Sequence, residues 1–139
     1  MIFVDTSFFI ALFAKTGEDH DRAVEVFKEF HGRHLPGFLV TTDIIVLETV
    51  TLARRRSNHR EAVFIGERLY SEKIARIHRA SFEEQLLAFD YFRRYADKDY
   101  STVDCLRFVV MDRREITEAL ALDSDFTHRF TVRPGLLRR

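Results

Sequence analysis

The strongest evidence for the fold class lies near the start of the chain, in Ile2-Phe3-Val4-Asp5-Thr6-Ser7-Phe8-Phe9-Ile10-Ala11-Leu12-Phe13-Ala14. Its first three apolar residues predict a short strand, and Thr6 and Ser7 offer N-cap chemistry for a helix through Ala14. A strand followed directly by a helix is typical of an α/β domain. Asp5 then lies just past the carboxyl end of the strand, where open α/β sheets bind their ligands.

Helical and extended patterns alternate along the rest of the chain. Apolar residues recur at helical spacing between Asp21 and His31, Gly17 marks a turn, and Ser81-Phe82-Glu83-Glu84 is a capping box. We expect helices over residues 21–31, 44–53, 60–71, 81–95 and 101–113, and strands over residues 38–40, 73–79 and 119–122. We expect the helix over residues 44–53 to be buried and to be capped by Asp43. The order predicts an α/β sandwich with a mostly parallel sheet.

Length and composition indicate one globular domain over residues 1–139. The chain has 46% hydrophobic and 32% charged residues, and its 22 basic residues balance 22 acidic ones. Its single cysteine, Cys105, excludes a disulfide framework and multi-thiolate zinc sites, which favours a reducing, cytoplasmic location. No apolar run approaches the ~20 residues that cross a bilayer, so we expect a soluble protein with no membrane contact.

Familiar catalytic signatures are absent from the sequence. It contains no GxGxxG, no phosphate-binding loop with its lysine, no HExxH and no GxSxG. The six histidines are scattered through polar segments, which argues against a histidine metal site.

Four carboxylates remain in otherwise apolar surroundings. Asp5 and Asp123 each follow a predicted strand, and Glu48 is the only charge within residues 44–53. Asp104 lies in a helix that continues with apolar residues. We expect these four side chains to converge at the carboxyl edge of the sheet.

Each carboxylate also has a purely structural explanation. Asp5 is able to cap the first helix, and Asp123 is able to open an Asx turn. Asp104 completes a Ser101-x-x-Asp104 capping box. Glu48 would need a buried partner such as Arg107, since a buried carboxylate must be paired, protonated or bound to a cation.

A cluster of acids without His or Cys suits Mg²⁺ or Mn²⁺, which take carboxylate oxygens. Such a site supports phosphoryl chemistry, because the metal activates water and neutralises phosphate charge. Without metal, converging carboxylates repel one another. Neutralising Glu48 or Asp104 is therefore expected to leave the metal-free protein as stable or more stable.

Short motifs around these acids resemble those of PIN-domain nucleases. They are Phe3-Val4-Asp5-Thr6-Ser7, Glu48 on its helix, Asp99-Tyr100-Ser101-Thr102-Val103-Asp104-Cys105, and Ala121-Leu122-Asp123-Ser124-Asp125-Phe126. The resemblance covers nearly the whole chain, and single-domain proteins of this size are similar to VapC-type toxins of toxin–antitoxin pairs. It implies a PIN-like three-layer sandwich.

The resemblance also implies a Mg²⁺- or Mn²⁺-dependent endoribonuclease. Its catalytic and metal-binding quartet would be Asp5, Glu48, Asp104 and Asp123. The supporting positions would be Thr6, Ser7 and Ser101, whose hydroxyls orient the acids or water, with Asp99 and Asp125 in secondary roles. The alternative is a non-catalytic PIN-fold module that binds RNA or an antitoxin.

The implied partners are RNA, a cognate antitoxin and a second copy of the chain. Because the net charge is zero, RNA needs a local basic patch, and Arg54-Arg55-Arg56 is the densest one. These arginines equally suit the C-terminal dipole of their helix. The helix over residues 81–95 has apolar residues on more than one side, which leaves some for an interface.

Two phosphate-handling classes also begin with an aspartate after the first strand. Haloacid-dehalogenase-like phosphatases need a second aspartate two residues later, where this chain has Ser7. Receiver domains need a late lysine, and no lysine follows Lys98. Both classes fit worse than a nuclease.

Overall fold

The computed structural model describes residues 1–30 and 38–122, and the backbone of residues 131–134. In these ranges the elements are β1 (Ile2–Val4), α1 (Thr6–Phe13), α2 (Glu18–Phe30), β2 (Leu39–Thr42), α3 (Asp43–Arg56), α4 (His59–Tyr70), β3 (Arg76–His78), α5 (Phe82–Arg94), α6 (Thr102–Arg113), β4 (Glu118–Ala121) and β5 (Thr131–Pro134). Helices and strands alternate, so the predicted α/β class is confirmed.

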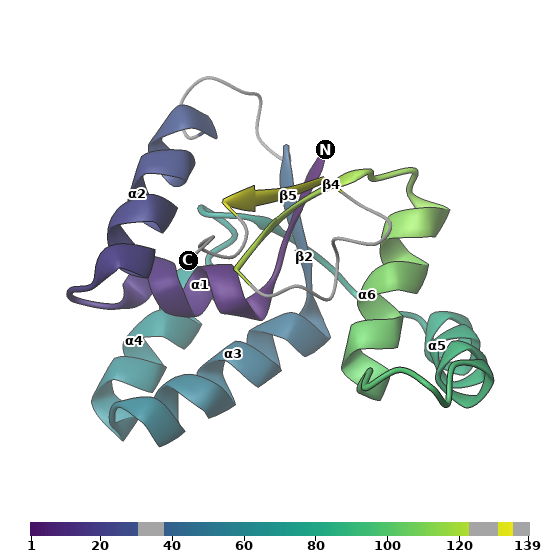
Figure 1. The fold of residues 1–139 in the computed structure, drawn as a ribbon. Helices are drawn as coiled ribbons and strands as arrows, with labels where there is room; N and C mark the ends of the chain where they lie inside the picture. The colour runs from purple at the N-terminus through teal and green to yellow at the C-terminus, as the bar shows by residue number, and fades with distance from the viewer. Residues whose placement is uncertain (31–37, 123–130, 135–139) are drawn as a thin grey trace.

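The strands form one sheet in the order β3-β2-β1-β4-β5, and every neighbouring pair is parallel. Helices α1, α2 and α4 lie on one side of the sheet and α5 and α6 on the other (Figure 1), which confirms the three-layer sandwich. Because the strands are parallel, the ends of β1, β2 and β4 open on the same edge.

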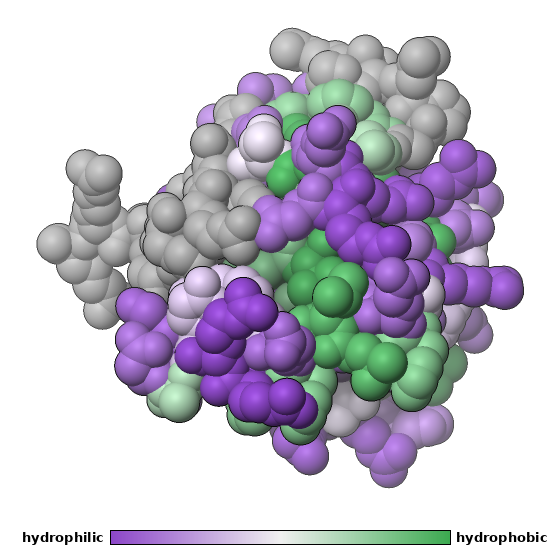
Figure 2. Space-filling view, turned by 90° about the vertical axis from the view of Figure 1, so that its right-hand side faces the viewer, coloured by the Kyte–Doolittle hydropathy of each residue, from purple (hydrophilic) through white to green (hydrophobic). Residues whose placement is uncertain are grey.

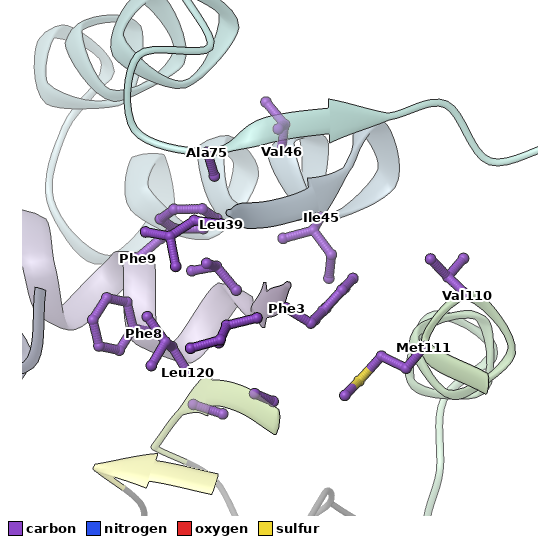
Figure 3. Close-up of a cluster of buried hydrophobic side chains, with 14 of the residues drawn as sticks. Phe3, Phe8, Phe9, Leu39, Ile45, Val46, Ala75, Val110, Met111 and Leu120 are labelled. Carbon is purple, nitrogen blue, oxygen red and sulfur yellow. The ribbon is translucent and has the colours of Figure 1, made fainter. Parts of the chain in front are cut away.

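The core lies on both faces of the central strand β1, whose three residues are all buried. Figure 3 shows side chains from β1, α1, α3, α6 and β4 meeting around Phe3. Phe3, Phe8 and Phe9 are fully buried, and each such side chain stabilises the fold by about 1.5–3 kcal/mol relative to exposure. This packing fixes where β1 ends and α1 begins, and therefore where Asp5 lies.

Two helices differ from the prediction at their N-termini. Helix α2 begins at Glu18, earlier than expected. It follows Gly17 directly, and the φ of 120° at Gly17 agrees with the turn predicted there. Helix α3 is capped by Thr42, whose hydroxyl accepts from Ile45 N–H at 3.1 Å, so the cap predicted at Asp43 is wrong. Asp43 is the first residue of α3, and its Oδ1 accepts from the backbone N–H of Ile44 at 2.9 Å and from that of Ala80, just before α5, at 3.0 Å.

Helix α3 is also only half buried. Ile45, Val46 and Thr49 face the core, whereas Leu47 is 55% exposed. The prediction of a buried helix therefore holds for one face of α3 only, because the other face is turned outward. Glu48 lies at the border between the two faces and is half-buried.

The strands differ more than the helices. The strand expected over residues 73–79 shortens to β3, because the chain turns at Glu72, which has a left-handed φ of 57°, and still bends over residues 73–75. The strand β2 runs on to Thr42, past the expected end at residue 40. Strand β5, parallel to β4, was not predicted. No helix in the described part of the chain is long and apolar enough to cross a membrane.

Candidate active site

Asp5 is fully buried between β1 and α1. It is the N-cap of α1, and its Oδ2 accepts from the Ser7 hydroxyl at 2.9 Å and from Ser7 N–H at 3.3 Å. Its backbone N–H donates to Leu120 O in β4 at 3.0 Å. The capping interpretation is confirmed, and it leaves Oδ1 directed to another partner.

Asp104 lies in the first turn of α6 and also caps it. Asp104 Oδ2 accepts from Ser101 N–H at 2.8 Å, and the Ser101 hydroxyl accepts from Asp104 N–H at 3.1 Å. The predicted capping box is confirmed. As in Asp5, one carboxylate oxygen holds a helix start and the other stays available, so capping does not exclude a place in a site.

The guanidinium of Arg107 joins these two remaining oxygens. Its Nη1 donates to Asp5 Oδ1, and its Nη2 donates to Asp104 Oδ1. Arg107 was the partner considered for Glu48, and it forms ion pairs with Asp5 and Asp104. The structure brings these two acids together with a cation between them, which opposes the repulsion expected between them.

Glu48 reaches the same region from α3. Its Oε2 accepts a hydrogen bond from the hydroxyl of Thr6, the residue after Asp5. Thr49 lies 3.4 Å from the Thr6 hydroxyl and donates to Ile45 O at 2.7 Å. Arg107 thus joins Asp5, which follows β1, to Asp104 of α6, while Glu48 of α3 contacts Thr6, the next residue along the chain from Asp5.

The model of the PIN domain family matches residues 2–129. The chain belongs to the PIN domain family. It is 35% identical over 128 residues, which are 91% of this chain and 92% of the relative, to the 23S rRNA-specific endonuclease VapC20 of Mycobacterium tuberculosis, in the strains CDC 1551 / Oshkosh and ATCC 25618 / H37Rv. The crystal structure of M. tuberculosis VapC20, described as a sarcin-ricin loop cleaving toxin, is similar with a TM-score of 0.81 and 30% identity over 92% of this chain and 94% of that chain.

Two acids of the predicted PIN site, Asp123 and Asp125, lie outside the described residues. Leu122, which precedes Asp123 in the chain, donates its N–H to the Ser7 hydroxyl at 2.9 Å. The Ser7 hydroxyl in turn donates to Asp5. Residue 122 is therefore two hydrogen bonds from the Asp5 carboxylate.

The chemistry of these acids, though not yet their spacing, fits a hard divalent cation. Asp5, Glu48 and Asp104 offer only carboxylate oxygens, the donors that Mg²⁺ and Mn²⁺ prefer. Two of these carboxylates already converge on one cation, the Arg107 guanidinium. Among the described residues, no three Asp, Glu, His or Cys side chains are close enough together to hold a metal ion.

The remaining predicted positions differ in their surroundings. Thr6, Ser7 and Ser101 each contact one of the acids, as described above. Asp99 is exposed in the loop between α5 and α6.

The predicted basic patch is exposed at the end of α3. Arg54, Arg55 and Arg56 occupy the last turn of the helix, where they suit its dipole. Arg54, Arg55 and His59 also line an open groove between α3 and α4. Both interpretations of the patch are therefore compatible with its position.

Sequence reasoning missed the place of Arg107 in the site. Its signal was present: it is the only cation within the apolar segment of residues 103–111, three residues after Asp104. Side chains three apart lie on one face of a helix, so the pair with Asp104 was predictable. The pair with Asp5, which is 102 residues away in sequence, depends on the fold.

Proposed function

We propose that this PIN domain, a single domain over residues 1–139, is a Mg²⁺- or Mn²⁺-dependent endoribonuclease and the toxin of a toxin–antitoxin pair. The observation that carries the proposal is the convergence of Asp5 and Asp104 at the carboxyl edge of the sheet. It is supported by the identity of 35% with an rRNA endonuclease over 91% of the chain. The substrate proposed for the first test is 23S rRNA, which that relative's name specifies.

The quartet Asp5, Glu48, Asp104 and Asp123 is proposed to hold the cation. A cation bound there would polarise the attacking water and neutralise the charge of the scissile phosphate. The residues of this chain position the acids: Ser7 holds Asp5, Ser101 holds Asp104, and Thr6 holds Glu48. Fixed carboxylates need no reorganisation when the charge of the transition state develops.

The groove lined by Arg54, Arg55 and His59 is proposed to bind the phosphate backbone of the RNA. Because such contacts release counterions, binding through them weakens as salt increases. We place the protein in the cytoplasm, with a cognate antitoxin as its regulator.

A second copy of the chain is the further proposed partner, and its site is the outer face of α5. Apolar side chains gather on the face of the molecule that carries α5 and α6 (Figure 2). The exposed apolar residues of and beside α5 are Phe82, Leu86, Leu87, Phe89, Phe92 and Tyr95. Patches of this kind mark interaction sites.

The test is cleavage of purified 23S rRNA and of intact ribosomes, with Mg²⁺, with Mn²⁺ or with excess EDTA. We expect discrete cleavage with either metal and none in EDTA. Asp104→Asn is expected to abolish cleavage, because it removes a proposed metal ligand. Asp90→Asn is the matched control, since Asp90 is a half-exposed residue of α5 paired only at the surface with Arg94.

Two outcomes would contradict the proposal. RNA that is bound but stays intact with every metal would indicate the non-catalytic PIN-fold module instead. Undiminished cleavage in EDTA would exclude the metal mechanism and direct attention to His59 or His78 as general bases.

A further inference from the structure

Arg107 occupies the centre of the proposed metal site. It is 3% exposed, and its two terminal nitrogens contact two different carboxylates, one from β1–α1 and one from α6. The oxygens that it contacts, Oδ1 of Asp5 and Oδ1 of Asp104, are the ones that the helix caps do not use. These are the same oxygens that a shared metal ion would take.

We propose that Arg107 is an internal counter-cation that competes with the divalent metal for Asp5 and Asp104. The inference rests on the proposed metal-dependent function and adds a residue to it. In the metal-free protein Arg107 neutralises part of the charge of the converging acids. When metal is supplied, Arg107 releases one or both oxygens, so the metal-free and metal-bound states are alternatives.

The charges explain how the metal-free protein tolerates two acids side by side. Asp5, Asp104 and Arg107 together carry a formal charge of about −1, because guanidinium stays protonated at any physiological pH. The fully buried Asp5 carboxylate beside that of Asp104 would be strongly unfavourable without a cation, since a buried charge needs a partner. A protein that keeps its own cation therefore folds before it acquires metal.

Of the two carboxylates that Arg107 contacts, one is accessible to solvent. The Asp5 side chain is fully buried, whereas 14% of the Asp104 side chain is exposed. Asp104 also lies on the same helix as Arg107, one turn away. We therefore expect the contact between Arg107 and Asp104 to open first.

Competition predicts the sign of a mutational effect on metal affinity. Arg107→Gln removes the competing cation, so the carboxylates no longer have to be freed before metal binds. Mn²⁺ should bind at least about fivefold more tightly, the lower end of typical coupling between ligands. The same variant should melt below the wild type in EDTA, because Asp5 and Asp104 then repel one another.

The experiment is calorimetric titration of the full-length, metal-free chain with Mn²⁺, together with thermal melting in EDTA. Arg113→Gln is the matched control: it lies on the same helix, 43% of its side chain is exposed, and its Glu83 partner is 3.8 Å away. It should bind Mn²⁺ as the wild type does. Arg107→Lys keeps the positive charge, but an ammonium group does not bridge two carboxylates as a guanidinium does. The Mn²⁺ affinity of this variant should therefore lie between those of the wild type and Arg107→Gln.

Arg107→Gln that binds Mn²⁺ no more tightly than the wild type would overturn the inference while leaving the metal-dependent function intact. A wild type that binds no Mn²⁺ would overturn both. If Arg107→Gln does not fold, Arg107→Lys decides, and unchanged affinity there counts against competition. The wild type provides another readout: the guanidinium NMR signal of Arg107 should shift on saturation with Mg²⁺, and an unmoved signal would contradict displacement.

Discussion

Asp5 is the residue on which the fold and the proposed site both depend. It caps α1, accepts two hydrogen bonds from Ser7 and pairs with Arg107 while fully buried. Asp5→Asn leaves the buried guanidinium without one of its charged partners. We expect a loss of about 3–5 kcal/mol in the free energy of unfolding, typical of breaking a buried ion pair from one side.

Urea unfolding in EDTA measures this loss. Asp90→Asn again serves as control, because its pair with Arg94 is exposed and contributes at most about 1 kcal/mol. Equal stability of Asp5→Asn and wild type would show that mutual repulsion of the acids, and not their pairing with Arg107, dominates the metal-free site.

Among single residues, the acids of the site were easier to predict from the sequence than the side chains they pair with. Asp5 and Asp104 stood out because each interrupts an apolar segment, and each indeed combines a capping role with a place beside the other. The two explanations had been treated as alternatives, yet a carboxylate has two oxygens and serves both. Arg107 was assigned to Glu48 as a possible partner, because a long-range pair cannot be read from local spacing.

Among the elements, α5 is tied to the edge of the sheet through one buried acid. Glu84, which is 5% exposed, accepts from Ser81 N–H and contacts His78 Nε2 of β3, each at 2.9 Å. Burial by itself would raise the pKa of Glu84. The hydrogen bonds from Ser81 and His78 outweigh it and lower the pKa below its usual 4.5.

A depressed pKa in the folded state makes stability depend on pH with a definite sign. Ionised Glu84 stabilises the fold above its unfolded-state pKa, near 4.5, and this contribution is lost as pH falls through the lower folded-state pKa. Glu84→Gln should therefore reduce stability at pH 7 and flatten the decline below about pH 4.5. Urea unfolding at pH 7 and in acid measures this, with the exposed neighbour Glu83→Gln as control. An acid decline as steep in Glu84→Gln as in the wild type would contradict it.

The helices with strong local signals were predicted with their starts, whereas β3 was predicted too long and β5 was not predicted. Both capping boxes, Ser81 with Glu84 and Ser101 with Asp104, placed helix starts to the residue. Strands β3 and β5 have three and four residues, too few for an alternating pattern to set their limits. Strand β5 ends on Pro134, a residue that sheets tolerate at edges and that lowers a strand's signal in sequence.

For the whole molecule, the proposed dimer depends on the outer face of α5. Phe82 is 72% exposed and Leu86 55%, so neither is needed to hold the isolated chain together. A stable interface buries roughly 800 Å² on each partner and is centred on apolar side chains. The apolar residues of α5 form such a centre, whereas the groove lined by Arg54 and Arg55 lies between α3 and α4 and stays free for RNA.

Leu86→Lys is expected to separate the dimer into monomers of 16.4 kDa, because it would bury an unpaired charge at the interface. Light scattering after size-exclusion chromatography measures the mass. The thermal midpoint of the Leu86→Lys monomer should stay close to that of the wild type at a dilution where the wild type is also monomeric. Asp97→Lys, in the loop after α5, adds positive charge outside the apolar face and should remain dimeric. A wild type that is monomeric at micromolar concentration, or a Leu86→Lys variant that stays dimeric, would place the interface elsewhere. Because Asp5 and Asp104 come together within one chain, the monomeric variant is also expected to retain Mn²⁺ binding.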